Sequence, residues 1–297
     1  MADPIGIVGG GALGTLLASR FLAVKADVRV AVRSRSRLDD LMRDYPALRA
    51  GVGFEVLRGS RLVLLSVKAY DVAEVAGSLA PLDLREAPIC SFQNGWGHME
   101  VLEAALPRLP LLAGATSLGA YLDGRGTLRA AEDGATLVAP WRPEDLAPAE
   151  RAAETLRGAG LKADARPDAR AVLWRKLVLN SAVNPLTALA RCTNGTILLE
   201  PTLFGVAKHA AGEAARVGWK LGILEKDFDY EAALHSILHE TAGNRSSMLE
   251  DLDRGRRTEV EEITGAVVRL AKEAGEPAPT QEALLTLIRA AENRLQN

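Results

Sequence analysis

The amino-acid sequence predicts an α/β fold, with an N-terminal doubly wound parallel sheet and an all-helical C-terminal domain. Short apolar runs alternate with helix-like segments through the first half of the 297-residue chain, an order typical of parallel strands wound with helices. A glycine-rich turn directly follows the first apolar run. Beyond residue 167, almost every stretch shows helical periodicity with abundant Ala and Leu. At roughly 100–200 residues per domain, the length also suggests two domains.

The first half of the chain supplies the strands of the predicted sheet, because its apolar runs are typical of buried strands. The change of pattern at Pro167-Asp168 predicts one domain over residues 1–166 and a helical domain over residues 167–297. Breaks in the helical part are expected at prolines 185, 201, 277 and 279. We expect strands at residues 5–8, 28–32, 62–67, 88–92 and 161–165, further strands within 111–140, and helices at 11–24, 70–80 and 142–158.

Bulk composition argues against several classes of protein. Apolar residues make up 48% of the chain and charged residues 25%, the balance of an ordinary globular protein. The formal net charge of -2 suggests neither a nucleic-acid footprint nor a polybasic membrane patch. Residues 5–24 lack the basic start of a signal sequence, and no run reaches the ~18 apolar residues of a membrane helix. We therefore expect a cytoplasmic protein without nucleic-acid or membrane partners.

No metal site is expected. The two cysteines, Cys90 and Cys192, form neither a metal-binding spacing nor a disulfide framework, and scattered cysteines are usually buried apolar residues. His235 and His239 lie one helical turn apart, but two ligands alone seldom make a metal site.

The glycine-rich turn matches the dinucleotide-binding pattern G-x-G-x-x-G in residues 9–14, and it lies between a predicted strand and a predicted helix, as this pattern requires. Gly9 permits the tight turn, Gly11 lets a pyrophosphate approach the backbone, and Gly14 lets the helix pack close to the strand. The helix start offers free N–H groups to the phosphates. The alternative is a glycine-rich turn without a ligand. The expected cofactor-binding residues of the turn are Gly9, Gly10, Gly11, Ala12, Leu13 and Gly14.

The end of the second predicted strand indicates the cofactor. Enzymes that use NAD usually carry Asp or Glu there, about 20 residues beyond the glycines, whereas residues 31–38 of this chain contain no carboxylate and the next one is Asp39. Instead it has Arg33, Arg35 and Arg37 among serines, which suit a 2′-phosphate. We therefore predict NADP(H), with Arg33 as the first candidate to bind the 2′-phosphate. A solvated basic turn is the alternative.

Three further segments carry polar residues in unusual places. Residues 66–70 and 93–97 follow predicted strands, and ligands of doubly wound sheets bind beyond such strand ends. Lys176, Asn180 and Asn184 recur every four residues in an otherwise apolar helix, so they share one face. Burying an ammonium group is costly unless it is paired, and a Lys that reaches solvent beside two capping amides is the alternative. Pro185 should end or bend this helix.

A set of motifs extends this interpretation, and in order it spans residue 5 to about residue 290. The motifs are GGGALG (9–14), VKAY (67–70), QNGWG (93–97), LWRKLVLNSAVNPLTAL (173–189), NRSSMLEDL (244–252) and TEVEEITG (258–265). Together they resemble those of the ketopantoate reductase (2-dehydropantoate 2-reductase) family. The lysine helix and the Ser-Ser-Met-Leu segment are much more specific than the glycine turn. The resemblance implies a Rossmann-type domain that binds NADP and a helical domain that binds substrate and performs catalysis.

The resemblance also implies a role for individual residues. Lys176 and Glu259 match catalytic positions, with Lys176 as the general acid. Glu259 also matches a position near the cofactor ribose, and Thr258 is expected to cap a helix with Glu259 in its first turn. Glu213 fills an acidic helix position whose role is left open. The substrate-binding residues implied are Asn180, Asn184, Asn194, Asn244 and Ser247, and the further cofactor-binding residues are Lys68, Asn94 and Ala120.

The activity that the resemblance implies is NADPH-dependent reduction of 2-dehydropantoate to pantoate, in pantothenate biosynthesis on the way to coenzyme A. Hydride transfer to the carbonyl carbon builds negative charge on the oxygen, which a lysine ammonium stabilises and protonates. One alternative is a reductase of another small 2-oxo acid, because the motif positions contact the oxo-acid group and not its branched tail. Another is a non-catalytic NADPH-binding regulator. An apolar C-terminal helix fits a homodimer surface and equally a place in the core.

Overall fold

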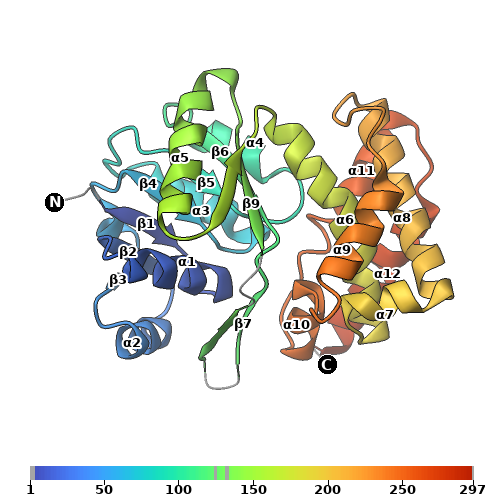
Figure 1. Cartoon of the computed structure of the whole chain (residues 1–297), viewed down its shortest axis with the longest axis horizontal. Helices are drawn as coiled ribbons and strands as arrows, with labels where there is room; N and C mark the ends of the chain where they lie inside the picture. Colours follow the sequence, from blue (N-terminus) through green and yellow to red (C-terminus); the bar gives the residue numbers. More distant parts are fainter. Residues whose placement is uncertain (1–3, 124–125, 131–133, 296–297) are drawn as a thin grey trace. The chain divides into compact units, whose positions relative to one another are not determined.

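The computed structural model describes residues 4–123, 126–130 and 134–295. The chain divides into two compact units, each described by itself below. Unit 1 comprises Met1–Gln93 and His98–Val172, and unit 2 comprises Asn94–Gly97 and Leu173–Asn297. Among the described residues, all strands lie in unit 1, whereas unit 2 is helical and contains α6 (Ala169–Ala190) from Leu173 on and the helices that follow it (Figure 1).

An eight-stranded sheet forms the centre of unit 1, in the order β10-β9-β6-β5-β4-β1-β2-β3. Every neighbouring pair from β3 to β6 is parallel, and β9 pairs antiparallel with β6 and parallel with β10. The order 3-2-1-4-5-6 is that of Rossmann-type sheets, which confirms the predicted fold class. The strands are β1 (Ile5–Val8), β2 (Val28–Val32), β3 (Arg49–Val52), β4 (Leu62–Leu65), β5 (Ile89–Ser91), β6 (Leu111–Thr116), β9 (Ala135–Pro140) and β10 (Lys162–Ala165), with β7 (Ala120–Leu122) and β8 (Leu128–Ala130) in a separate antiparallel pair.

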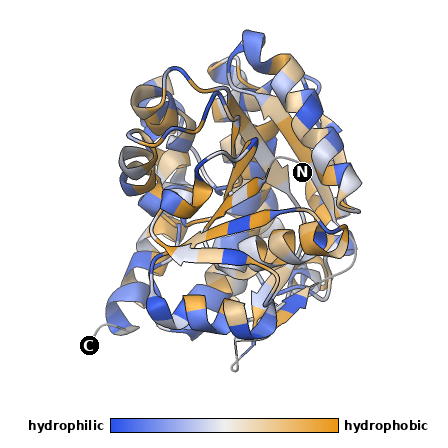
Figure 2. Ribbon diagram, turned by 90° about the vertical axis from the view of Figure 1, so that its left-hand side faces the viewer, coloured by the Kyte–Doolittle hydropathy of each residue, from blue (hydrophilic) through white to orange (hydrophobic). Residues whose placement is uncertain are grey.

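Both faces of this sheet are buried. Side chains alternate along a strand, so Ile5 and Ile7 of β1 point to one face, where they join Leu17 of α1 in an apolar core. Val63 and Leu65 of β4 point to the opposite face and are fully buried as well. Burial on both faces explains the unbroken apolar runs of the sequence, and the strands are mainly in hydrophobic colours in Figure 2. The helical segments of unit 1 are α1 (Ala12–Ala23), α2 (Arg35–Asp44), η1 (Glu55–Leu57), η2 (Ala69–Asp71), α3 (Val72–Leu79), α4 (His98–Ala105), η3 (Pro143–Asp145) and α5 (Leu146–Gly158).

Unit 2 packs its helices around Trp174, which is completely buried. The indole Nε1 of Trp174 donates a hydrogen bond to the Ala214 carbonyl oxygen at 3.0 Å. Gly218 lies on α8 (Pro201–Lys220), and a Cβ on it would lie 2.3 Å from the same nitrogen. Only glycine therefore lets α8 approach the indole so closely. The helices are α6 (Ala169–Ala190), α7 (Asn194–Leu199), α8 (Pro201–Lys220), α9 (Tyr230–Glu240), α10 (Ser247–Asp253), α11 (Thr264–Ala274) and α12 (Pro279–Leu295).

Pro185 does not end its helix, and this part of the prediction is wrong. Helix α6 continues through Pro185 to Ala190, although a proline in a helix interior removes one backbone hydrogen bond. The hydroxyl of Thr187 lies 3.0 Å from the carbonyl oxygens of both Val183 and Asn184. Leu186, directly after the proline, is 6% exposed. Burial of the last turn therefore offsets what the proline costs, which the sequence pattern alone does not reveal.

Glu213 caps a helix, a role that the sequence did not indicate. Its carboxylate is buried in α8 and accepts hydrogen bonds from the backbone N–H groups of Thr280 and Gln281, at 3.0 and 2.9 Å. These N–H groups belong to the first turn of α12, where no intrahelical acceptor exists. The Gln281 side chain in turn donates to the Ser181 hydroxyl of α6 at 2.9 Å. Glu213 therefore ties α8 to α12, and Gln281 ties α12 to α6.

Glu213→Ala should lower the free energy of unfolding by about 1–3 kcal/mol, because it leaves two helix-start N–H groups unpaired in the protein interior. Urea unfolding followed by circular dichroism measures the change. Glu282→Ala is the matched control, since Glu282 lies in the first turn of the same helix but is exposed, and it should change stability much less. Equal losses for the two variants would show that the buried cap contributes nothing special.

Candidate active site

The glycine turn lies beyond the carboxyl ends of β1 and β4, the neighbours at which the strand order reverses. Gly9 has a φ of +106°, which favours glycine. A Cβ on Gly14 would lie 2.0 Å from the Gly9 carbonyl oxygen, whereas a Cβ on Gly11 would meet no atom within 4 Å. The hydroxyl of Ser66, after β4, lies 3.0 Å from the Val8 carbonyl oxygen. The turn is thus closely packed at Gly9 and Gly14, against Ser66, and open at Gly11.

The open side of this turn fits a dinucleotide pyrophosphate. Gly11 is exposed and is the N-cap of α1, with no side-chain hydrogen bond to the helix start. The first N–H groups of α1 therefore have no intrahelical acceptor and can bind an anion. The other expected cofactor positions of unit 1, Lys68 after β4 and Ala120 at the start of β7, are both half-buried.

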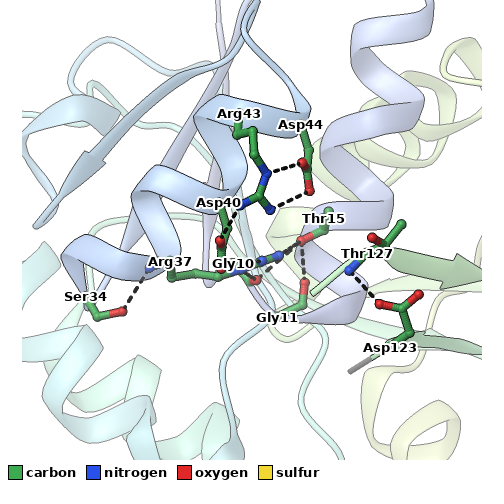
Figure 3. Close-up of polar contacts among 10 residues, drawn as sticks. All are labelled: Gly10, Gly11, Thr15, Ser34, Arg37, Asp40, Arg43, Asp44, Asp123 and Thr127. Carbon is green, nitrogen blue, oxygen red and sulfur yellow. Dashed lines mark hydrogen bonds and ion pairs between the residues drawn. The ribbon is translucent and has the colours of Figure 1, made fainter. Parts of the chain in front are cut away.

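The three arginines differ in their surroundings. The side chains of Arg33 and Arg35 are 82% and 80% exposed, and each pairs loosely with an aspartate. Arg37 is only 18% exposed, and it donates from Nε to the Gly10 carbonyl oxygen at 2.5 Å. Figure 3 shows its side chain directed from α2 toward the glycine turn. Burial lowers the pKa of the Arg37 guanidinium, and the carboxylate of Asp40 opposes this shift.

Lys176, Asn180, Glu259 and Asn94 come together within unit 2. The Asn94 amide nitrogen donates to Glu259 Oε2 at 3.2 Å, and the Asn180 amide nitrogen donates to Asn94 Oδ1 at 3.4 Å. Glu259 is 4% exposed, and Asn94 and Asn180 are half-buried. The side-chain amide of Asn94, which has both a donor and an acceptor, thus links the Glu259 carboxylate to Asn180 on the lysine helix α6. Three separate segments contribute to this cluster.

The electrostatics of the cluster act on Lys176. Its surface is partly exposed, yet burial around the ammonium group lowers the pKa of Lys176 to about 8, and the charge of Glu259 opposes this shift. Desolvation disfavours the charged form of a lysine, whereas a nearby carboxylate favours it. Burial is the larger effect, so Lys176 can release a proton near neutral pH more readily than an ordinary lysine.

The remaining expected substrate residues lie on neighbouring segments of unit 2. The backbone N–H of Asn194 donates to the Asn244 carbonyl oxygen at 2.9 Å, and the Asn194 amide nitrogen donates to the Thr241 hydroxyl at 2.8 Å. Ser247 is the exposed first residue of α10, and Asn184 is 8% exposed on α6.

A buried pair of hydroxyls links these two helices. Thr187 of α6 donates to the Ser246 hydroxyl at 2.7 Å, and Ser246 caps α10 by accepting from the Leu249 backbone N–H at 3.1 Å. Both residues lie inside the motifs that carry the resemblance, but no spacing rule pairs them.

The expected helix start at Thr258 is wrong. Helix α11 begins only at Thr264, with Ile263 as its N-cap, so Glu259 lies in the turn before the helix. Thr258 Oγ1 accepts from the Val260 backbone N–H at 3.1 Å, a bond across a local turn and not a helix cap. The Ile263 N–H bonds the Glu259 carbonyl oxygen at 2.9 Å. These two bonds hold the turn in which Glu259 lies.

The segment Asn94–Gly97 lies in unit 2, although it directly follows the end of a unit 1 strand. A Cβ on Gly95 would lie 2.3 Å from the Glu262 carbonyl oxygen, and the Trp96 backbone N–H donates to that oxygen at 2.9 Å. The Trp96 ring meets the Trp174 ring edge-on with centroids 4.9 Å apart. Gly95 and these packing contacts explain how Asn94 reaches Glu259, which strand-end reasoning missed.

Other kinds of site receive no support. Across the described ranges, no group of three or more His, Cys, Asp or Glu side chains could hold a metal ion. None of the helices in this part of the chain has an apolar stretch long enough to span a lipid bilayer. Cys90 is buried and unpaired, and burial raises the pKa of its thiol.

Comparison with known proteins gives the relationship of the chain. Residues 5–143 match the family model described as ketopantoate reductase PanE/ApbA, and residues 168–292 match the one described as ketopantoate reductase PanE/ApbA C terminal. The 2-dehydropantoate 2-reductase of Archaeoglobus fulgidus is 35% identical over 302 residues, which cover 97% of this chain and 98% of the relative.

Solved structures share the fold over the whole chain. A PanE/ApbA family ketopantoate reductase from Ralstonia eutropha JMP134 has a TM-score of 0.86 at 23% identity, covering 99% of this chain and 100% of that one. D-mandelate dehydrogenase, solved with NADH and anilino(oxo)acetate, has a TM-score of 0.90 at 22% identity and covers 99% of both chains. At these identities the structures support the fold alone. The two family models and the full-length relative confirm the resemblance: this chain belongs to the ketopantoate reductase PanE/ApbA family.

Proposed function

We propose that this protein reduces 2-dehydropantoate to pantoate with NADPH, a step of pantothenate biosynthesis. The observation that carries the proposal is Lys176, whose pKa is lowered to about 8 beside Glu259. Perturbed groups of this kind gather at active sites. The identity of 35% over the whole length to a protein named 2-dehydropantoate 2-reductase supports the choice of substrate.

The proposal assigns one role to each domain. Residues 1–166 would bind the cofactor through residues 9–14, Arg33, Lys68 and Ala120. Residues 167–297 would bind the oxo acid through Asn180, Asn184, Asn194, Asn244 and Ser247, with Ser247 at its carboxylate. Asn94 would be a further cofactor-binding residue, and Glu259 would act both in catalysis and at the cofactor ribose. A bound NADPH supplies the hydride that reduces the carbonyl carbon.

Lys176 would deliver the proton. As the carbonyl carbon is reduced, negative charge grows on its oxygen, and the Lys176 ammonium stabilises this charge and transfers a proton from Nζ to it. The charge of Glu259 keeps the ammonium form populated, because it opposes the effect of burial. Asn94 holds that carboxylate through the hydrogen bond of 3.2 Å. The amides of Asn180 and Asn184 on α6 would bind the oxo-acid group.

The pH dependence of the reaction tests this division of roles. Since Lys176 acts in its protonated form, kcat/KM should be highest below the pKa of Lys176 and should fall as the pH rises through about 8. Glu259→Gln removes the charge that raises this pKa, so the fall should move to lower pH. Profiles of kcat/KM from mildly acidic to alkaline pH, for the unchanged protein and for Glu259→Gln, measure this shift.

Glu261→Gln is the control for this profile, because Glu261 pairs with Arg289 at 2.6 Å and does not appear among the charges acting on Lys176. Its profile should match that of the unchanged protein. An alkaline fall that stays at the same pH in Glu259→Gln would show that Glu259 does not act on the proton donor.

The activity itself is tested by following nicotinamide oxidation with a panel of 2-oxo acids, once with NADPH and once with NADH. Saturable turnover that is fastest with 2-dehydropantoate and NADPH is the expected result. Faster turnover of an aryl oxo acid, or preference for NADH, would move the assignment toward the chemistry named for D-mandelate dehydrogenase. Tight NADPH binding without any turnover would indicate a regulator, and would contradict the proposal.

A further inference from the structure

Arg37 binds the glycine turn and the helix that follows it, and its guanidinium is not free to meet a phosphate. Its Nε donates to the Gly10 carbonyl oxygen at 2.5 Å, and its Nη2 donates to the Thr15 hydroxyl at 2.7 Å. Its Nη1 lies 3.9 Å from Asp40 Oδ2. All three guanidinium nitrogens thus already face protein acceptors, as Figure 3 shows, and only 18% of the side chain is exposed.

Thr15 extends this contact to the next carbonyl of the turn. Its hydroxyl lies 2.8 Å from the Gly11 carbonyl oxygen and 3.3 Å from that of Gly10, so it can accept from Arg37 while donating to the turn. Thr15 itself is 2% exposed. Arg37 of α2 therefore holds the Gly10 carbonyl directly and the Gly11 carbonyl through the buried Thr15 hydroxyl of α1.

These two peptide groups are the ones that a pyrophosphate would approach. A carbonyl held on the protein side fixes the plane of its peptide, and therefore the direction of the N–H group that follows it. A binding loop that is ordered before the ligand arrives loses less entropy on binding. The charge-assisted bonds from Arg37 are strong enough for this task.

Arg33 and Arg35 are placed differently. Their side chains are 82% and 80% exposed, and their partners Asp71 and Asp39 lie at 3.7 and 3.2 Å. Exposed ion pairs of this kind contribute little, so either arginine can turn toward a ligand at small cost. Releasing Arg37 would instead remove the charge-assisted donor from both the Gly10 carbonyl oxygen and the Thr15 hydroxyl.

We propose that Arg37 is a positioning residue that holds the glycine turn ready for the dinucleotide, for NADPH and NADH alike, and that it is not a ligand of the 2′-phosphate, which the proposed function assigns to Arg33. This inference rests on the proposed function, since it presumes that the turn binds a nicotinamide dinucleotide. The sequence suggests one task for the three arginines, binding of the 2′-phosphate, whereas the inference gives Arg37 a separate task, positioning of the turn.

The test compares dissociation constants for NADPH, NADH and ADP-ribose, of which the last two lack the 2′-phosphate. Arg37→Gln should weaken all three by the same factor, about tenfold for the loss of charge-assisted bonds. Arg33→Gln should weaken NADPH alone. Arg37→Lys keeps the charge but cannot reach both acceptors, so it should restore only part of the affinity. Arg58→Gln, a half-exposed arginine of the same unit that pairs with Glu55, is the matched control and should change nothing.

Thr15→Val gives a second route to the same answer, because it removes the shared hydroxyl without touching an arginine. It should weaken all three ligands, and the double variant with Arg37→Gln should lose less than the sum of the two single losses. If Arg37→Gln does not fold, Thr15→Val and Arg37→Lys still decide the matter.

Two results would overturn the inference. Weakening of NADPH alone in Arg37→Gln would make Arg37 a ligand of the 2′-phosphate, and unchanged affinity for all three would leave it without a role in binding. An unchanged protein that binds none of the three would instead disprove the proposed function, and the inference with it. Ligand binding by the unchanged protein therefore distinguishes failure of the proposed function from failure of the inference about Arg37.

Discussion

Lys176→Ala is expected to reduce kcat/KM for the oxo acid by about 10²–10⁴-fold, the contribution typical of a positioned proton donor. Alanine removes both the proton and the charge that stabilises the developing oxyanion. The cofactor turn of unit 1 does not involve Lys176, so the dissociation constant of NADPH should remain near its original value. Steady-state kinetics and a fluorescence titration of NADPH measure the two quantities separately.

Lys208→Ala is the control for this loss. Lys208 lies on the surface of α8, where it pairs with Glu231 at 2.7 Å, and its removal should leave turnover unchanged. Full turnover in Lys176→Ala would show that another group protonates the product, and the proposed role of Lys176 would have to be abandoned.

The glycine turn carries the second large effect: substitution of either Gly14 or Gly11 should impair NADPH binding, but only that of Gly14 should also lower stability strongly. In Gly14→Ala the new Cβ would lie 2.0 Å from the Gly9 carbonyl oxygen and 2.5 Å from Ser66 Oγ. The backbone must shift, so we expect a loss of stability of about 3 kcal/mol or more together with the loss of NADPH binding. In Gly11→Ala the Cβ would meet no protein atom within 4 Å.

Gly11 also has an ordinary backbone conformation, with φ at -70° and ψ at -172°. The stability of Gly11→Ala should therefore stay within about 1 kcal/mol of the original, while the Cβ obstructs the approach of a pyrophosphate. Thermal unfolding and NADPH titration of both variants separate folding from binding. Normal NADPH affinity in Gly11→Ala would mean that the phosphates do not approach the turn at this glycine.

Features that depend on neighbouring residues could be predicted from the sequence. The strand before residues 9–14 and the helix after them are read from local apolar patterns, and the glycines follow from backbone geometry that no neighbouring element changes. The face shared by Lys176 and Asn180 follows from helical periodicity alone. These are the features on which the family resemblance depended, and the family models match both parts of the chain.

Features that depend on distant contacts were missed or wrong. The sequence predicts that Pro185 ends or bends α6, but the helix continues through it to a buried turn. Thr258 has the sequence of a helix cap, yet the turn around Glu259 delays the helix to Thr264. In both cases a local rule worth about 1–3 kcal/mol competes with tertiary packing of similar size, and the sequence shows only one side of that balance.

The sequence by itself determined the doubly wound sheet, the glycine turn after its first strand and the helix that carries Lys176, because each is specified by residues close together in the chain. Only the tertiary structure decided which side chains meet. It joined Asn94 to Glu259, assigned Glu213 to the start of α12, and separated Arg37 on the turn from the exposed Arg33. The physical reason is that a contact between distant segments depends on the packing of every element between them, which no spacing rule in one chain encodes.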